Sequence, residues 1–144
     1  MKNNIKLNIT VPGQTRYLSL IGHIGENLAR AVCACDAERE SLAQKLNIVL
    51  TEAMVNTIKH ANIGNPEKDI QINISISDKE LIIRIYDCGK GFNIQDVGMP
   101  GIDADILSER GRGIYIIKSL MDSVVYIRKQ HCNYLEMRGT LNKS

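Results

Sequence analysis

Two polar side chains four residues apart carry the strongest chemical signal in this sequence. Glu52 and Asn56 lie in residues 50–60, which otherwise have the pattern of an amphipathic helix. A spacing of four places both side chains on one helical face, so they can reach the same ligand. An asparagine oxygen is a hard ligand suited to Mg²⁺, and a carboxylate one turn earlier can accept a proton from an attacking hydroxyl.

The same pair has plainer interpretations. Five residues form the predicted inward stripe of this helix: Leu42, Leu46, Val49, Ala53 and Thr57. Asn56 falls within the stripe and Glu52 flanks it, so the pair alone fits a satisfied core asparagine beside a surface glutamate. With His60 one turn further on, the three could suggest a metal triad, but this ligand set is wrong for a tight zinc site.

Asp87 is the second candidate, at the end of an apolar strand. Leu81, Ile83 and Ile85 share one face of that strand, and Asp87 continues their series. A carboxylate at the edge of the core needs hydrogen-bond donors. Adenine offers an exocyclic amino group where guanine has a carbonyl, so such a site should prefer ATP to GTP. Taken alone, Asp87 could simply open the turn that follows it.

Two glycine pairs complete the pattern. Gly89 and Gly91 follow the acidic strand end and allow unusual backbone angles and close approach of a ligand. Gly111 and Gly113 stand at the start of a predicted helix, where backbone N–H groups can point at phosphate oxygens. A lone pair of this kind is usually a turn. Two residues add positive charge near the second pair, or are only solvated loop charges: Arg110 and Arg112.

The elements that must position these residues follow from periodicity and turn signals. Period-two and helical patterns alternate along the chain, and Asp36 is the predicted N-cap of the second helix. This order predicts an α+β fold, a two-layer α/β sandwich whose mixed or antiparallel sheet is covered on one face by helices. The expected elements are strand 5–11, helices 14–33 and 36–62, strands 70–76 and 81–87, a loop over 92–110, helix 113–121, and a closing hairpin of strands 124–128 and 134–141.

Composition limits the functional classes. The length of 144 residues fits one domain, and 44% hydrophobic residues suffice for a core. A net charge of +2, one phenylalanine and no tryptophan argue against direct binding of nucleic acid. The sequence has neither an apolar run long enough for a membrane span nor the apolar block of a signal peptide, so we expect no membrane association and a cytoplasmic location.

Taken in order, these motifs resemble those of the GHKL ATPase superfamily, which includes nucleotide domains of gyrase, Hsp90, histidine kinases and MutL. Residues 52–56 are similar to its N box, 87–92 to its G1 box and 110–113 to its G2 box. The short chain most resembles the anti-sigma factor serine kinases of the SpoIIAB and RsbW type, above all over residues 108–122. The resemblance covers residues 5–141.

The resemblance implies a single histidine-kinase-like ATPase domain over residues 1–144, with the Bergerat fold and with Mg²⁺ and ATP bound. Asn56 would hold the metal, Asp87 the adenine, and residues 93–110 would form a lid. Glu52 would be the catalytic base for a serine hydroxyl on a STAS-type anti-anti-sigma factor. Such proteins are typically homodimers that also hold a sigma factor. Further residues would shape the nucleotide pocket: Gly89, Gly91, Arg110, Gly111, Arg112 and Gly113.

Two departures from the family pattern leave alternatives open. The segment before Gly111 does not match the arginine-bearing lid of the relatives, so either Arg110 or Arg112 could meet the γ-phosphate. The residues Gly139 and Thr140 come too late for the familiar Gly-Thr start of the last strand. Two other functions use the same motifs: an ATP-binding module that sequesters a regulator without chemistry, and a detached catalytic domain that phosphorylates histidine on another chain.

Overall fold

The computed structural model describes residues 4–33, 35–60, 68–87, 112–128 and 133–141. Within these ranges, strands and helices follow the predicted order, with most boundaries within about two residues of the expected ones. The elements are β1 (Ile5–Pro12), a 3₁₀ turn (Thr15–Tyr17), α1 (Leu18–Val32), α2 (Asp36–His60), β2 (Asp69–Ile76), β3 (Glu80–Asp87), α5 (Arg112–Leu120), β4 (Ser123–Arg128) and β5 (Asn133–Thr140).

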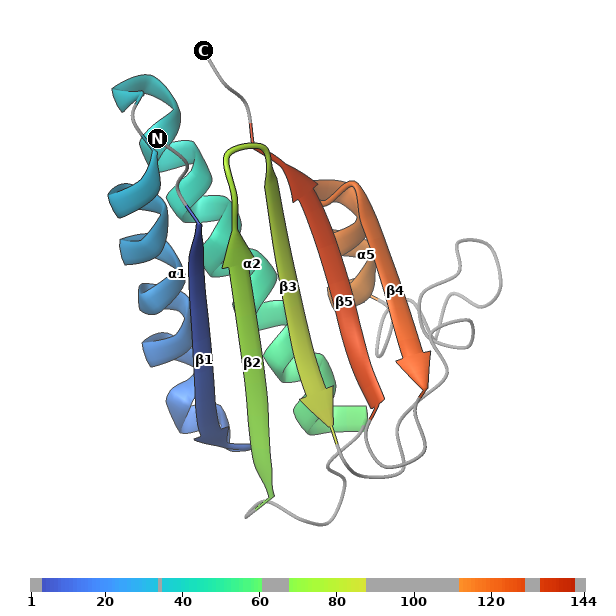
Figure 1. Cartoon of the computed structure of the whole chain (residues 1–144). Coiled ribbons are helices and arrows are strands. Elements are labelled where there is room, and N and C mark those ends of the chain that lie inside the picture. Colours follow the sequence, from blue (N-terminus) through green and yellow to red (C-terminus); the bar gives the residue numbers. More distant parts are fainter. Residues whose placement is uncertain (1–3, 34, 61–67, 88–111, 129–132, 142–144) are drawn as a thin grey trace.

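The five described strands form one sheet in the order β1-β2-β3-β5-β4, and each neighbouring pair is antiparallel. Figure 1 shows the three helices α1, α2 and α5 side by side on one face of this sheet. The other face carries no helix of the described chain. The architecture confirms the predicted α+β fold with helices on one face, and it narrows the expected sheet from mixed or antiparallel to antiparallel.

Alternation along the strands explains which face is covered. Ile70, Ile72, Ile74 and Ile76 of β2 are at most 3% exposed, whereas Gln71 between them is exposed. Period-two spacing puts the isoleucines toward the helices and the polar residues on the opposite face. The β1–β2 and β2–β3 registers keep this order across the sheet, because isoleucines of β2 pair with apolar residues of both neighbouring strands. The helix-facing side of the sheet is therefore one continuous apolar layer.

The helix α2 occupies the middle of the helical layer, between α1 and α5 (Figure 1). Four residues of the predicted stripe are buried, but Leu42 is only half-buried. Leu50 and Met54 lie outside that stripe and yet are fully buried. A helix that packs on the sheet and on two other helices buries more than one stripe of residues. A prediction based on a single amphipathic face therefore misses some of the buried residues of α2.

The start of α2 differs from the prediction by one residue. Asp36 is the first helical residue, and the carbonyl oxygen of Cys35 accepts the backbone N–H groups of Glu38 and Arg39 at 3.2 and 3.0 Å. Asp36 instead forms an ion pair with Arg39 at 2.8 Å, one turn along. An aspartate in the first turn still stabilises the positive end of the helix. Among the described helices, none is long and apolar enough to cross a membrane.

Candidate functional site

The final turns of α2 and the end of β3 lie at the same edge of the molecule, which is the lower edge in Figure 1. The strand β4 also ends at this edge, and β5 begins there. Antiparallel pairing produces this arrangement, because Asp87 at the end of β3 pairs with Asn133 at the start of β5. The fold thus brings the C-terminal turns of α2 and the acidic end of β3 to one edge.

Asn56 is buried on α2 and has an unsatisfied polar atom. Its side chain is 3% exposed, and within the described chain its Nδ2 atom finds no hydrogen-bond partner. The neighbouring Thr57 is 2% exposed but donates its hydroxyl to the carbonyl of Ala53 at 3.0 Å. An unpaired buried polar group costs about 1–3 kcal/mol, so the amide of Asn56 destabilises the core unless a ligand supplies its partner.

This amide fits a phosphate or a hydrated cation. The nitrogen can donate to a phosphate oxygen, and rotation of the amide about its last side-chain bond puts the oxygen in the same place. Amide oxygens are hard ligands of the kind that Mg²⁺ takes, together with waters and phosphate oxygens. The satisfied-asparagine interpretation of Asn56 therefore finds no support in the described chain.

Glu52 lies against the first turn of α5. A Cβ atom built on Gly113 would be 2.9 Å from Oε2 of Glu52 and 3.7 Å from its backbone oxygen. A side chain at position 113 would displace the carboxylate of Glu52. The half-buried Glu52 thereby connects α2 with the start of α5, which contains Gly113. Its carboxylate lies near the positive end of the α5 dipole.

Asp87 is buried as predicted, with 2% of its surface exposed. Its Oδ2 atom accepts a hydrogen bond from the hydroxyl of Tyr126 at 3.0 Å. Sequence reasoning missed Tyr126, although a signal was present. Val124, Tyr126 and Arg128 alternate along a short strand, and a tyrosine on the inward face near its end needs a partner for its hydroxyl.

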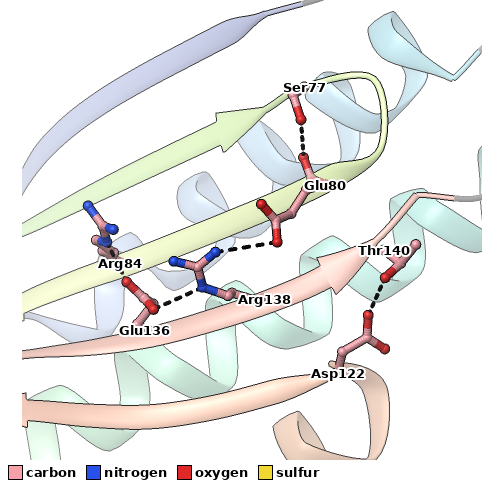
Figure 2. Close-up of polar contacts among 7 residues, drawn as sticks. All are labelled: Ser77, Glu80, Arg84, Asp122, Glu136, Arg138 and Thr140. Carbon is pink, nitrogen blue, oxygen red and sulfur yellow. Dashed lines mark hydrogen bonds and ion pairs between the residues drawn. The ribbon is translucent and has the colours of Figure 1, made fainter.

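The glycine and threonine near the C-terminus lie far from Asp87. Gly139 pairs with Leu81, at the opposite end of β3, and its alpha carbon faces the side chain of Met121. Thr140 donates its hydroxyl to Oδ2 of Asp122 at 2.5 Å (Figure 2). Gly139 and Thr140 thus lie at the end of β5 and not at its start, where the family pattern has its Gly-Thr pair. Neither residue takes part in the candidate site.

The remaining predicted residues divide into two groups. Arg112 is the first residue of α5 and is exposed. The lid expected over residues 93–110 lies outside the described residues, as do four predicted site residues: Gly89, Gly91, Arg110 and Gly111. Their assignment to the nucleotide pocket stays a prediction.

A charged network lies on the sheet face opposite the helices, away from this site. Glu136 accepts hydrogen bonds from Nε of Arg84 at 2.7 Å and from Nε of Arg138 at 3.0 Å, and Arg138 also contacts Glu80 (Figure 2). Burial by itself raises the pKa of Glu136, but the hydrogen bonds and charges of the two arginines outweigh it and hold this pKa below its ordinary value. This network joins β3 to β5.

Known proteins with similar sequences bear on the family of this chain. The model of a protein family described as "Histidine kinase-like ATPase domain" matches residues 11–139. The serine-protein kinase RsbW of Bacillus subtilis is 30% identical over 131 residues, which span 86% of this chain and 79% of that protein. RsbW of Listeria innocua is 29% identical over 125 residues, spanning 83% and 77% of the two chains.

A solved structure shares the fold. The crystal structure of the SiaB-SiaC complex from Pseudomonas aeruginosa contains a chain that matches with a TM-score of 0.61. The match covers 94% of this chain and 89% of that chain, at 16% sequence identity. At this identity the likeness concerns the fold alone. It extends over almost the whole chain.

Proposed function

Since the chain belongs to the family of histidine kinase-like ATPase domains, in its RsbW-like branch, we propose that it is an ATP-dependent serine kinase acting on a partner protein. The observation that carries the proposal is the arrangement on α2. A half-buried Glu52 stands one turn before the buried, unsatisfied amide of Asn56 and touches the first turn of α5. A base, a ligand for a cation and a helix N-terminus are the groups that phosphoryl transfer needs.

Asn56 holds the phosphate end of the nucleotide in this proposal. Its amide would hold Mg²⁺, which would supply positive charge to the phosphates, and the start of α5 would offer backbone N–H groups to the phosphate oxygens. Further contacts to the nucleotide come from motif residues: Gly89, Gly91, Arg110, Gly111, Arg112 and Gly113. Asp87 accepts a hydrogen bond from the 6-amino group of adenine, for which its burial and its place at the strand end are suited.

Glu52 acts as the base. A serine hydroxyl of the partner attacks the γ-phosphorus, Glu52 takes the hydroxyl proton, and the bond from phosphorus to the bridging oxygen of ADP breaks. The products are a phosphoserine and ADP. Gly113 contributes by leaving room for the carboxylate, so that its position is fixed by packing against α5.

The partners follow from the RsbW-like branch. We propose that the phosphate acceptor is an anti-anti-sigma factor of the STAS type, and that the domain, as a homodimer, sequesters a sigma factor when that acceptor is phosphorylated. Light scattering of the purified protein would measure the oligomeric state. Affinity capture from the native host would show whether a sigma factor is retained, and a monomer or a preparation without sigma factor would contradict this part of the proposal.

A second function is favoured by one contact. Oε2 of Glu52 lies at the start of α5, where a carboxylate also stabilises a helix without any chemistry. In that case the domain is an ATP-dependent clamp that sequesters its regulator and transfers no phosphate. Glu52 is then a structural residue, and ATP binding through Asn56 and Asp87 alone controls the clamp.

One experiment separates the two functions. Each STAS-domain protein of the host is incubated with the purified chain, Mg²⁺ and γ-labelled ATP, and the phosphorylated residue is mapped. We expect Glu52→Gln to lower serine phosphorylation by about 10²-fold or more without loss of ATP binding. Asn56→Ala should abolish both. Transfer that is undiminished in Glu52→Gln would exclude the proposed base, and ATP binding without transfer to any of the STAS proteins would favour the clamp.

A further inference from the structure

Asp87 and Tyr126 meet across an intervening strand. β5 lies between β3 and β4, so these two residues are not on neighbouring strands. The registers place Tyr126 opposite Leu135, and Leu135 opposite Ile85. The phenol therefore extends over β5 and two residues along β3, where its oxygen lies 3.0 Å from Oδ2 of Asp87.

The surroundings of Tyr126 fix where its hydroxyl points. The half-buried ring packs against the hydrophobic core, so its two side-chain torsions have little freedom. Asp87, at 2% exposure, is more deeply buried than the tyrosine. A donor held by core packing thus meets a carboxylate that has little access to water.

The hydrogen bond has a directional consequence. A carboxylate has two oxygens and about four acceptor positions, so it can accept from Tyr126 and from a ligand at once. The bond to one oxygen restricts rotation of the carboxylate and so contributes to the direction in which its acceptor positions point. A carboxylate in a fixed orientation favours a ligand with a hydrogen-bond donor at the facing position. A ligand with an acceptor at that position would lose the hydrogen bond and bind more weakly.

We propose that Tyr126 is a positioning residue for recognition of the purine base. Through its hydrogen bond it orients Asp87 toward the 6-amino group of adenine, and it thereby sets the preference for adenine over bases that lack this group. The proposal rests on the proposed ATP site. It adds to that site a residue from β4, which lies outside the three sequence motifs.

The test compares ATP with purine riboside triphosphate, which lacks only the 6-amino group. Binding of both, and of GTP, is measured by calorimetry in Mg²⁺ for the whole chain and for Tyr126→Phe, which keeps the ring and removes the hydroxyl. We expect the preference for ATP over the purine analogue to fall by about tenfold, as for loss of one hydrogen bond to a charged group. Affinity for the analogue itself should be unchanged.

The control is Tyr134→Phe. Tyr134 lies on the other face of the sheet, where the centroid of its ring is 4.9 Å from that of the tilted Tyr86 ring. Removal of this hydroxyl should leave the preference for ATP as it is in the unaltered chain. An equal change in both tyrosine variants would overturn the assignment to Tyr126.

The outcomes also separate this inference from the proposed function. If the unaltered chain binds ATP no better than the analogue, Asp87 does not contact the 6-amino group. The adenine contact in the proposed function and the role of Tyr126 are then both refuted. If the unaltered chain prefers ATP and Tyr126→Phe keeps that preference, or loses affinity for both nucleotides alike, only the role of Tyr126 is refuted.

A measurement on the unaltered chain covers the case in which Tyr126→Phe does not fold. With tyrosine labelled with ¹³C at Cζ, the resonance of Tyr126 should move on addition of ATP and move less on addition of the purine analogue. Equal shifts with both nucleotides would show that the hydroxyl does not sense the 6-amino group, and would overturn the proposal.

Discussion

In the proposed ATP site, stability and ligand binding conflict at Asn56. The core of α2 around it consists of fully buried apolar residues such as Ala53 and Met54, and an amide with an unsatisfied nitrogen destabilises such a core. An apolar side chain at this position would suit the fold better. The sequence nevertheless has a polar residue here, which is the expected result when a site must bind a ligand at the expense of stability.

Replacement of Asn56 by leucine should therefore stabilise the empty protein. We expect the free energy of unfolding to rise by about 1 kcal/mol, because the unpaired amide is removed and the volume is nearly kept. The further stabilisation that Mg²⁺ and ATP give by binding only to the folded state should disappear. Urea denaturation with and without nucleotide measures both changes.

Thr57→Val is the matched control for this prediction. Its hydroxyl has a partner in Ala53, so its removal should lower the free energy of unfolding by about 1 kcal/mol and leave nucleotide binding intact. If Asn56→Leu destabilises the empty protein as much as Thr57→Val does, the amide is satisfied in solution and its availability to a ligand is refuted.

At the scale of elements, close contact between α1 and α2 depends on glycine. A Cβ atom on Gly25 would lie 2.6 Å from Cδ1 of Leu50 and 3.3 Å from the backbone carbon of Leu46. Both neighbours belong to the packed interior of α2 and are fully buried. The two helices can approach this closely only because α1 has no side chain at that point.

Gly25→Ala and Gly113→Ala should differ in their effect on stability. Alanine favours a helix over glycine by about 1 kcal/mol, but at Gly25 overpacking against α2 should outweigh this and destabilise the protein by about 1–3 kcal/mol. At Gly113 the nearest atom is the end of the flexible Glu52 side chain, so the fold should tolerate alanine. Thermal unfolding of both variants checks this. A Gly25→Ala variant as stable as the unaltered protein would show that the helices can separate at little cost.

Gly113→Ala should still impair catalysis. The new methyl group moves the carboxylate of Glu52 away from α5, and a displacement of about 1 Å in a reacting group can lower the rate by about 10²-fold. The rate of serine phosphorylation at saturating ATP measures this effect. Unchanged transfer in a folded Gly113→Ala variant would contradict the placement of the base against α5.

The elements were predictable from the sequence where one periodicity governs a segment. The isoleucines of β2 alternate with polar residues, and both the strand and its buried face follow from that pattern. Leu50 and Met54 were missed because α2 is surrounded on several sides, which periodicity along one chain does not reveal. Tyr126 was missed for a related reason, since its contact with Asp87 depends on the order of strands β3, β5 and β4.

At the scale of the whole molecule, the two faces of the sheet differ in chemistry. The helix-facing side is apolar up to the edge at which Asp87 lies, whereas the opposite side carries charges that join strands. Glu136 is the centre of that second side. It is 7% exposed although no described helix covers it, because two arginines from β3 and β5 enclose it.

The lowered pKa of Glu136 predicts an acid-dependent loss of stability. A carboxyl group whose pKa is lower in the folded state than in the unfolded state stabilises the fold at pH values above its unfolded pKa, which is near 4.5. This stabilisation is lost as the pH falls from the unfolded pKa through the folded pKa. Glu136→Gln keeps the shape and removes the charge. We expect it to lower the free energy of unfolding by about 1–2 kcal/mol at pH 7, a range reduced for the partial exposure of both arginines.

The difference between Glu136→Gln and the unaltered chain should then shrink as the pH falls below about 4.5. Urea denaturation of both proteins between neutral and acidic pH measures it. Glu80→Gln is the control, because Glu80 contacts Arg138 at 3.3 Å with 47% of its side chain exposed and should contribute at most about 0.5 kcal/mol. A deficit in Glu136→Gln that is constant with pH would mean that Glu136 stabilises the sheet by its shape and not by its charge.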